Sequence, residues 1–209
     1  MLEDFGLVLE RFFPKQNKVC ILSQNHGKFI AYANPKILDF LWPASSFHFS
    51  IKDANAKMFN IAQAWRNKIP IFSCQKKMVW LTNFARLCSK LFPTNFVCPQ
   101  TFQISCNIFE FDWAGLDHDL IDLTQKACLA AVLKTTGLIC DEAIDDLCAI
   151  FQIIVISKID PMVIPGLKSL ASKFKNYNFD TTSARKQIEI GLDKDFYPYF
   201  FELTKEKMN

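Results

Sequence analysis

The sequence predicts an α+β protein, with a small antiparallel β-barrel over residues 1–70 and an α-helical domain over residues 71–209. Before Pro70 the apolar residues form short β-branched and aromatic runs with turn residues between them, which is typical of strands. After Pro70 they recur every three or four residues, which is typical of helices that bury one face. Because no helix long enough for a parallel crossover interrupts the first part, we expect its strands to be antiparallel.

The expected strands are short, and the segments between them are rich in turn formers. Asn25-His26-Gly27 offers the φ > 0 positions of a tight hairpin, so we expect His26 to be a turn residue. Five short strands of this kind predict a small closed or partly open barrel. The expected strands cover residues 6–13, 18–23, 28–33, 47–51 and 58–65, and the last range also fits the start of a helix.

The expected helices begin and end at residues suited to those positions. Pro93 stops the first helix, and Gly137 is a good C-cap for the third. Asp141 and Glu142 begin the fourth, where they interact favourably with the positive end of the helix dipole. The expected helices cover residues 76–92, 99–111, 117–136, 141–158, 165–174, 182–192 and 196–208.

Composition places the chain among folded globular proteins, since half of the residues are apolar and 22% are charged. The longest nearly continuous apolar run, 147–156, is far shorter than the roughly 20 residues of a spanning helix. The acidic N-terminal residues do not resemble a signal peptide, so we expect a cytoplasmic protein with no membrane contact. Eight cysteines without Cys-x-x-Cys spacing indicate small buried side chains, with no metal site and no cofactor.

The net charge of +3 hides an asymmetry between the two halves of the chain. Residues 1–100 hold 13 Lys and Arg against 5 Asp and Glu, whereas residues 101–209 hold 11 against 16. The first half therefore carries +8 and the second −5. This division favours a polyanion as the partner of the first half, although drift in surface composition would give the same count.

The sequence contains none of the common phosphate-loop, nucleophile-elbow, zinc-protease or dinucleotide motifs, which indicates a protein that is not an enzyme. Asp117, Asp119 and Asp122 could hold a divalent metal if they converged, but such residues more often cap the first turn of a helix. The acidic group within residues 141–146 is expected to form a solvated helix terminus, and the alternative is a surface for a basic partner.

Basic and aromatic residues alternate along the first three expected strands and their loops. Such a face can bind single-stranded nucleic acid, because cations follow the phosphates and rings stack on the bases. About half of the side chains of an alternating strand point inward, so we expect only some of these rings to be exposed. The residues concerned are Arg11, Lys15, Lys18, Lys28 and Lys36, with Phe12, Phe13, Phe29 and Tyr32 among them.

Two stretches carry a resemblance to a known family. The residues Gly6-Leu-Val-Leu-Glu-Arg11, followed by 18–33 with its His-Gly-Lys hairpin, resemble the opening of the bacterial recombination mediator family RecO. Residues 129–139, Leu-Ala-Ala-Val-Leu-Lys-Thr-Thr-Gly-Leu-Ile, are similar to a helical segment of the same family. The resemblance implies an N-terminal oligonucleotide-binding (OB) fold followed by an α-helical domain.

The same resemblance implies a non-enzymatic DNA repair factor that binds single- and double-stranded DNA, anneals strands and helps to load the recombinase. Its expected partners are a RecR-like protein and the acidic C-terminal tail of the single-strand binding protein. On this basis the DNA-binding residues are Arg11, Lys15, Lys18, Lys28 and Lys36 for phosphates, Phe29 or Tyr32 for stacking, and Arg86 and Lys90 as an extension. The candidate contacts to the acidic tail are Lys126, Lys134, Lys168, Lys173 and Lys175.

The chain departs from the family at two places. Many relatives carry a basic cluster after the third strand, where this chain keeps only Lys36, and many carry paired cysteines for zinc, which this chain lacks. The loss of the basic cluster and the 21 Phe residues motivate an alternative function, a protein-interaction scaffold that has lost most DNA binding.

Overall fold

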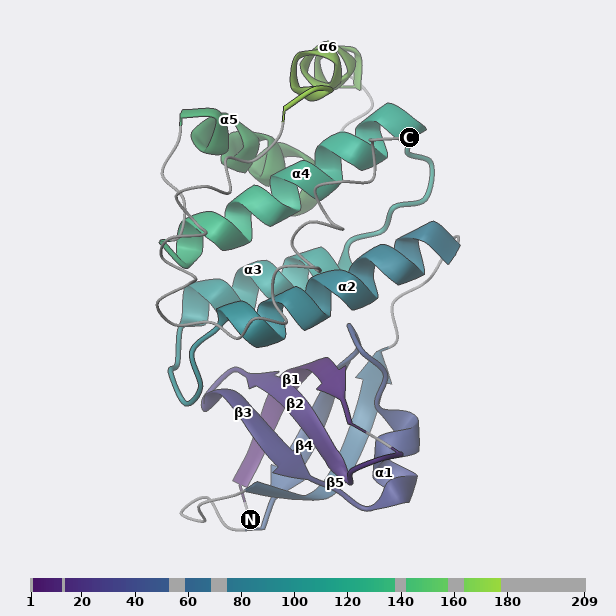
Figure 1. Cartoon of the computed structure of the whole chain (residues 1–209), viewed down its shortest axis with the longest axis vertical. Helices are drawn as coiled ribbons and strands as arrows, with labels where there is room; N and C mark the ends of the chain where they lie inside the picture. The colour runs from purple at the N-terminus through teal and green to yellow at the C-terminus, as the bar shows by residue number, and fades with distance from the viewer. Residues whose placement is uncertain are drawn as a thin grey trace. The chain divides into compact units, whose positions relative to one another are not determined.

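The computed structural model describes residues 2–12, 14–52, 59–68, 75–137, 142–157 and 164–177. The chain combines a five-stranded N-terminal sheet with helices, which confirms the predicted α+β class (Figure 1). The strands are β1 (Leu2–Arg11), β2 (Lys18–Ser23), β3 (Gly27–Tyr32), β4 (Ser46–Ile51) and β5 (Phe59–Lys68). The helices are α1 (Pro35–Phe40), α2 (Gln75–Leu91), α3 (Pro99–Glu110), α4 (His118–Thr135), α5 (Glu142–Phe151) and α6 (Ile164–Phe174).

The strands are hydrogen-bonded in the order β1-β2-β3-β5-β4, and because β4 also pairs with β1 the sheet closes on itself. All pairs are antiparallel except β3 with β5, which are parallel at Ala31–Phe59 and Tyr32–Asn60. The range 58–65, which the sequence left open between strand and helix, lies mainly in a strand. The sequence did not predict α1, which connects β3 to β4.

The β2–β3 hairpin turns at Asn25 and His26, as the sequence predicted. Asp4 is buried and accepts hydrogen bonds from the Ser23 hydroxyl and from the Asn25 amide, the latter at 2.8 Å. Gly27 has φ +69°, and a Cβ atom there would lie 2.2 Å from the carbonyl oxygen of Phe96. Only glycine therefore allows this close approach of the α2–α3 loop to the hairpin.

Aromatic and β-branched side chains fill the inside of the sheet. The core includes Val8, Phe29, Phe47 and Phe49, all at most 2% exposed. Leu7 is also buried, but it lies between Gly6 and Val8 in β1 and so points to the other face of the strand. Helix α2 contacts β1 and β2 and covers this outer face.

The described residues divide into two compact units, Met1–Phe109 and the residues from Glu110 onward. In the first unit α3 also contacts the sheet, where Phe102 meets Phe5 edge to face at 6.0 Å. Packing thus groups α2 and α3 with the strands, whereas the sequence predicted a domain boundary after residue 70.

In the second unit α4 packs against both α5 and α6. The expected fourth helix runs as α5 and then as a π-helical turn, η1 (Gln152–Ile156). The expected helices at 182–192 and 196–208 lie outside the described residues. Within the described part of the chain, no helix is long and apolar enough to cross a membrane.

Four of the six cysteines in the described residues are buried, as the sequence predicted: Cys20, Cys88, Cys106 and Cys128. Burial raises the pKa of the Cys20 thiol to about 12, so this side chain is a neutral part of the packing.

Candidate nucleic-acid interface

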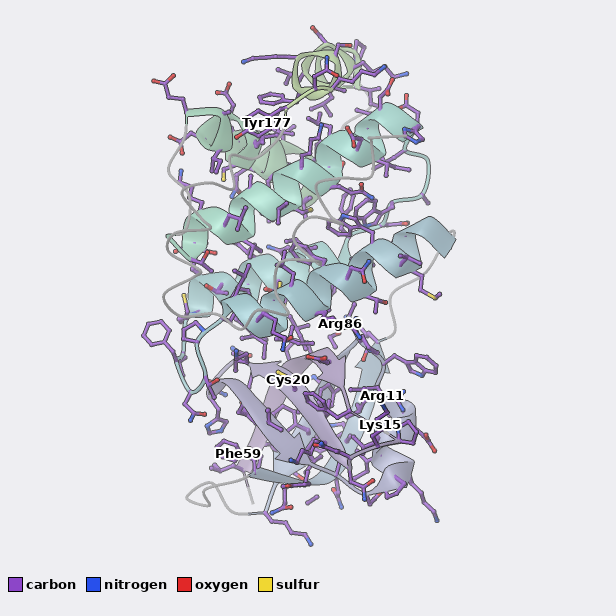
Figure 2. All side chains as sticks on the ribbon, in the orientation of Figure 1. Arg11, Lys15, Cys20, Phe59, Arg86 and Tyr177 are labelled. Atoms are coloured by element: carbon purple, nitrogen blue, oxygen red, sulfur yellow. The ribbon has the colours of Figure 1, made fainter. Side chains whose placement is uncertain are left out.

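Five of the predicted DNA-binding residues lie at one end of the sheet. Strand β1 ends at Arg11, β2 begins at Lys18 and β3 ends at Tyr32, and the antiparallel pairing brings these three ends together. Figure 2 shows Arg11 and Lys15 beside α1, which contains Lys36. We call Arg11, Lys15, Lys18, Tyr32 and Lys36 the basic surface.

Helix α1 places Lys36 at this end of the sheet. The Asn34 side chain accepts a hydrogen bond from the Ile37 N–H at 2.9 Å, and Pro35 occupies the first turn, where its missing N–H costs nothing. The Ala33 N–H donates to the Asn17 carbonyl at 3.2 Å, which joins the start of α1 to the β1–β2 turn that carries Lys15. Both Lys15 and Lys36 are exposed.

The two other cations of the basic surface, Arg11 and Lys18, contact aromatic rings. The Arg11 guanidinium lies 5.3 Å from the ring centre of Trp42 and 3.8 Å from the Asp39 carboxylate, with 15% of its side chain exposed. The Lys18 ammonium lies 5.2 Å from the ring centre of Tyr32, and both side chains are half-buried. Rings and cations therefore alternate at this end of the sheet, the combination that single strands require.

The other predicted basic residues of the first unit, Lys28, Arg86 and Lys90, lie on α2 or in contact with it. The Lys28 ammonium donates to the Ser89 carbonyl at 2.8 Å, and Arg86 lies 3.8 Å from the Glu10 carboxylate. Burial lowers the pKa of Lys28, and the positive charge of Lys90 lowers it further. Lys28 and Arg86 thus join the sheet to α2, and the structure does not bring them to the basic surface.

The prediction that Phe29 could stack on a base is wrong. Phe29 is 2% exposed and packs inside the sheet, with its ring centre 4.6 Å from that of Phe59. Phe29 therefore cannot stack on a base, and Tyr32, three positions along β3 and half-buried, is the remaining ring of that pair.

In the second unit four of the five predicted lysines contact acidic groups or carbonyl oxygens. The Lys126 side chain is 15% exposed and donates to the Phe174 and Lys175 carbonyls at 2.6 and 3.1 Å, at the C-terminal end of α6. Lys134, Lys168 and Lys173 form ion pairs with Asp145, Asp117 and Asp146 at 2.5, 2.8 and 2.9 Å. Lys175 is exposed. Most of the positive charge predicted to receive an acidic tail is therefore balanced within the unit.

The acidic residues of the second unit serve as caps and ion-pair partners. Asp117 accepts a hydrogen bond from the Leu120 N–H at 3.0 Å as the N-cap of α4, and its contact with Lys168 lowers its pKa. Asp122 lies 3.3 Å from Lys126. Asp141 lies outside the described residues. Within the described residues, no group of three or more His, Cys, Asp or Glu side chains could hold a metal ion.

An aromatic row that the sequence did not predict crosses the outside of β1, β4 and β5. Phe5 pairs with His48 and His48 pairs with Trp65 across the strands. Their ring centres are 4.9 and 6.3 Å apart, and His48 and Trp65 are stacked at 22°. The alternation of Phe47-His48-Phe49 was the only sequence signal, since it placed His48 on the face opposite the two buried Phe rings.

No protein-family model matches this chain, and no curated protein matches it significantly.

Proposed function

We propose that the chain binds single-stranded DNA through the basic surface. The observation that carries this proposal is that Lys15, Lys18 and Lys36 lie at the same end of the sheet, where the Lys18 ammonium is 5.2 Å from the ring centre of Tyr32. Within the described residues, no carboxylate forms an ion pair with Lys15 or Lys36, so their charge is available to phosphates. Each phosphate that a lysine neutralises releases a counterion, which favours binding at low salt.

The strand order supports an OB-fold as the basis of this function. A five-stranded sheet that closes on itself, with a helix between β3 and β4, matches the small Greek-key barrel that binds oligonucleotides in many proteins. In that fold the loop between the first two strands is one of the binding elements. Here that loop carries Lys15 and is flanked by Arg11 and Lys18.

The resemblance to the RecO family extends the proposal to a cellular function. A RecO-like mediator would anneal strands and load a recombinase with a RecR-like protein and the single-strand binding protein, in the cytoplasm and without catalysis of its own. For the acidic tail of the single-strand binding protein, the second unit offers the exposed Lys175, while Lys134, Lys168 and Lys173 would have to exchange their carboxylate partners.

A protein-interaction scaffold is the second candidate, and the α2–α3 loop favours it. Phe96 and Val97 are 61% and 43% exposed, and the loop is held to β3 by a 2.7 Å hydrogen bond from the Asn95 N–H to the Lys28 carbonyl. A fixed loop with exposed apolar side chains is suited to protein contact. Loss of a copurifying protein on Phe96→Ser substitution, with DNA affinity absent in both proteins, would favour the scaffold.

The test is fluorescence anisotropy of a labelled oligodeoxythymidine of about 15 nucleotides, close to the upper site size of one OB-fold. For three phosphate contacts we expect affinity to fall about 20-fold between about 50 and 200 mM salt. Lys15→Ala with Lys36→Ala should reduce the slope of log K against log salt by about 1.4, since each contact to a single strand contributes about 0.7. No binding at either salt concentration would refute the proposal.

A further inference from the structure

A groove lies between α1 and β5, beside the basic surface. Its volume is about 560 Å³, and its lining includes Lys36 and Phe40 from α1 and Gln63 and Trp65 from β5. The groove lies where β5 has left β3, since the two strands pair only at Phe59 and Asn60 and β5 then continues beside β4 alone. Helix α1 contacts β5 beyond these pairs, and the small side chains of Ala62 and Ala64 leave space there.

The lining combines two rings with two polar groups. Phe40 is 48% exposed, and Trp65 is half-buried and held in place by its stacking on His48. Gln63 is exposed and offers both a donor and an acceptor, and Lys36 is an exposed cation. None of the described residues that line the groove is acidic.

This chemistry matches a flat aromatic ligand that carries an anion. Rings of Phe and Trp stack on any base, and an amide can hydrogen-bond the edge of a base. Lys36 belongs to both the groove and the basic surface, so a strand whose phosphates follow the basic surface would have a base within reach of the groove. An apolar side chain would gain nothing from Lys36 and would leave the Gln63 amide without a partner.

We propose that the groove between α1 and β5 accepts one base of the bound single strand. Phe40 and Trp65 stack on the base, Gln63 hydrogen-bonds its edge, and Lys36 contacts the adjoining phosphate. This inference rests on the proposed function, because it assigns a base-binding position within the same DNA-binding region.

The test compares oligodeoxythymidine with an abasic deoxyribose-phosphate strand of the same length, both labelled and bound to the full chain at low salt. The abasic strand keeps the phosphates and removes the bases. For the wild-type protein we expect oligodeoxythymidine to bind about 5- to 150-fold more tightly, the range for stacking of one base. Phe40→Ala should reduce this ratio severalfold without changing the salt slope, and Ala62→Leu, which fills the groove, should do the same.

Phe96→Ala is the matched control, since Phe96 is also an exposed ring of the first unit but lies on the α2–α3 loop. It should leave the ratio unchanged. Equal binding of the two strands by the wild-type protein, or an unchanged ratio in both Phe40→Ala and Ala62→Leu, would overturn the base site while the DNA-binding function stands. Absence of binding to either strand would refute the function itself and the base site with it.

Discussion

The lysines of the two compact units differ in their surroundings. Lys15 and Lys36 of the first unit are exposed on a part of the chain with few acids, whereas Lys134, Lys168 and Lys173 of the second unit each contact an aspartate. The same side chain is therefore available to a polyanion in one unit and balanced in the other. The charge asymmetry of the sequence corresponds to this contrast, and local acids decide which lysines can bind phosphate.

Phe29 and Tyr32 are two rings of β3 that differ in burial, and substitution of the buried Phe29 has the largest expected effect. Phe29→Ala should lower the free energy of unfolding by about 3–5 kcal/mol, because it removes a large side chain that is 2% exposed. Chemical denaturation followed by circular dichroism would measure it. A loss below about 1 kcal/mol would mean that Phe29 is not part of the core.

Lys126 and Lys36 form the next comparison. Lys126→Met should lower the free energy of unfolding by about 2 kcal/mol, since the charged donor to the Phe174 and Lys175 carbonyls is lost. Lys36→Met, on an exposed position, should change it by less than about 0.5 kcal/mol. Equal losses in the two denaturation curves would contradict the distinction between a structural and an available lysine.

Substitution of Tyr32 tests the basic surface, with a smaller expected effect on single-strand affinity. Because the ring is half-buried and lies beside Lys18, Tyr32→Ala should weaken single-strand binding by about 1 kcal/mol, or about fivefold, the lower end for one stacked base. Tyr32→Phe keeps the ring and should bind as the wild type does. Anisotropy titrations of the three proteins check this, and equal affinities would exclude stacking on Tyr32.

The smallest effect concerns the pKa values of two lysines. Burial lowers the pKa of Lys28, whereas the hydrogen bond from Lys168 to Asp117 raises the pKa of Lys168. Below the ordinary value of 10.5 the folded protein therefore loses the Lys28 proton before the unfolded chain does, so this lysine makes stability rise with pH between its folded and unfolded pKa values. NMR titration of the lysine side chains should show Lys28 titrating before Lys168, and the reverse order would contradict the assigned contacts.

The sequence predicted the strands and hairpin because their signals are local. Alternating apolar residues and Asn25-His26-Gly27 indicate structure without reference to distant residues. Helix α1 also has a local signal, Asn34 followed by Pro35, which is typical of a helix start.

Long-range pairing limited the prediction of the site. The face to which Phe29 points depends on the register of β3 with its neighbours, and Lys28 finds its acceptor at Ser89, 61 residues away. The Lys126–Asp122 pair has i, i+4 spacing and is readable from the sequence, whereas Lys168 and Asp117 meet only through packing of α4 and α6. The groove depends on the continuation of β5 past β3, which no local pattern encodes.

The most direct test compares equal charge removal in the two units. One variant carries Lys15→Ala, Lys18→Ala and Lys36→Ala, and the other carries Lys134→Ala, Lys168→Ala and Lys173→Ala. Binding of oligodeoxythymidine is measured for both and for the wild type over a series of salt concentrations. We predict that the first variant lowers the salt slope by about 2, from three lost contacts of about 0.7 each, and that the second leaves it unchanged. An equal reduction by both variants, or a reduction by the second alone, would contradict the assignment of DNA binding to the basic surface.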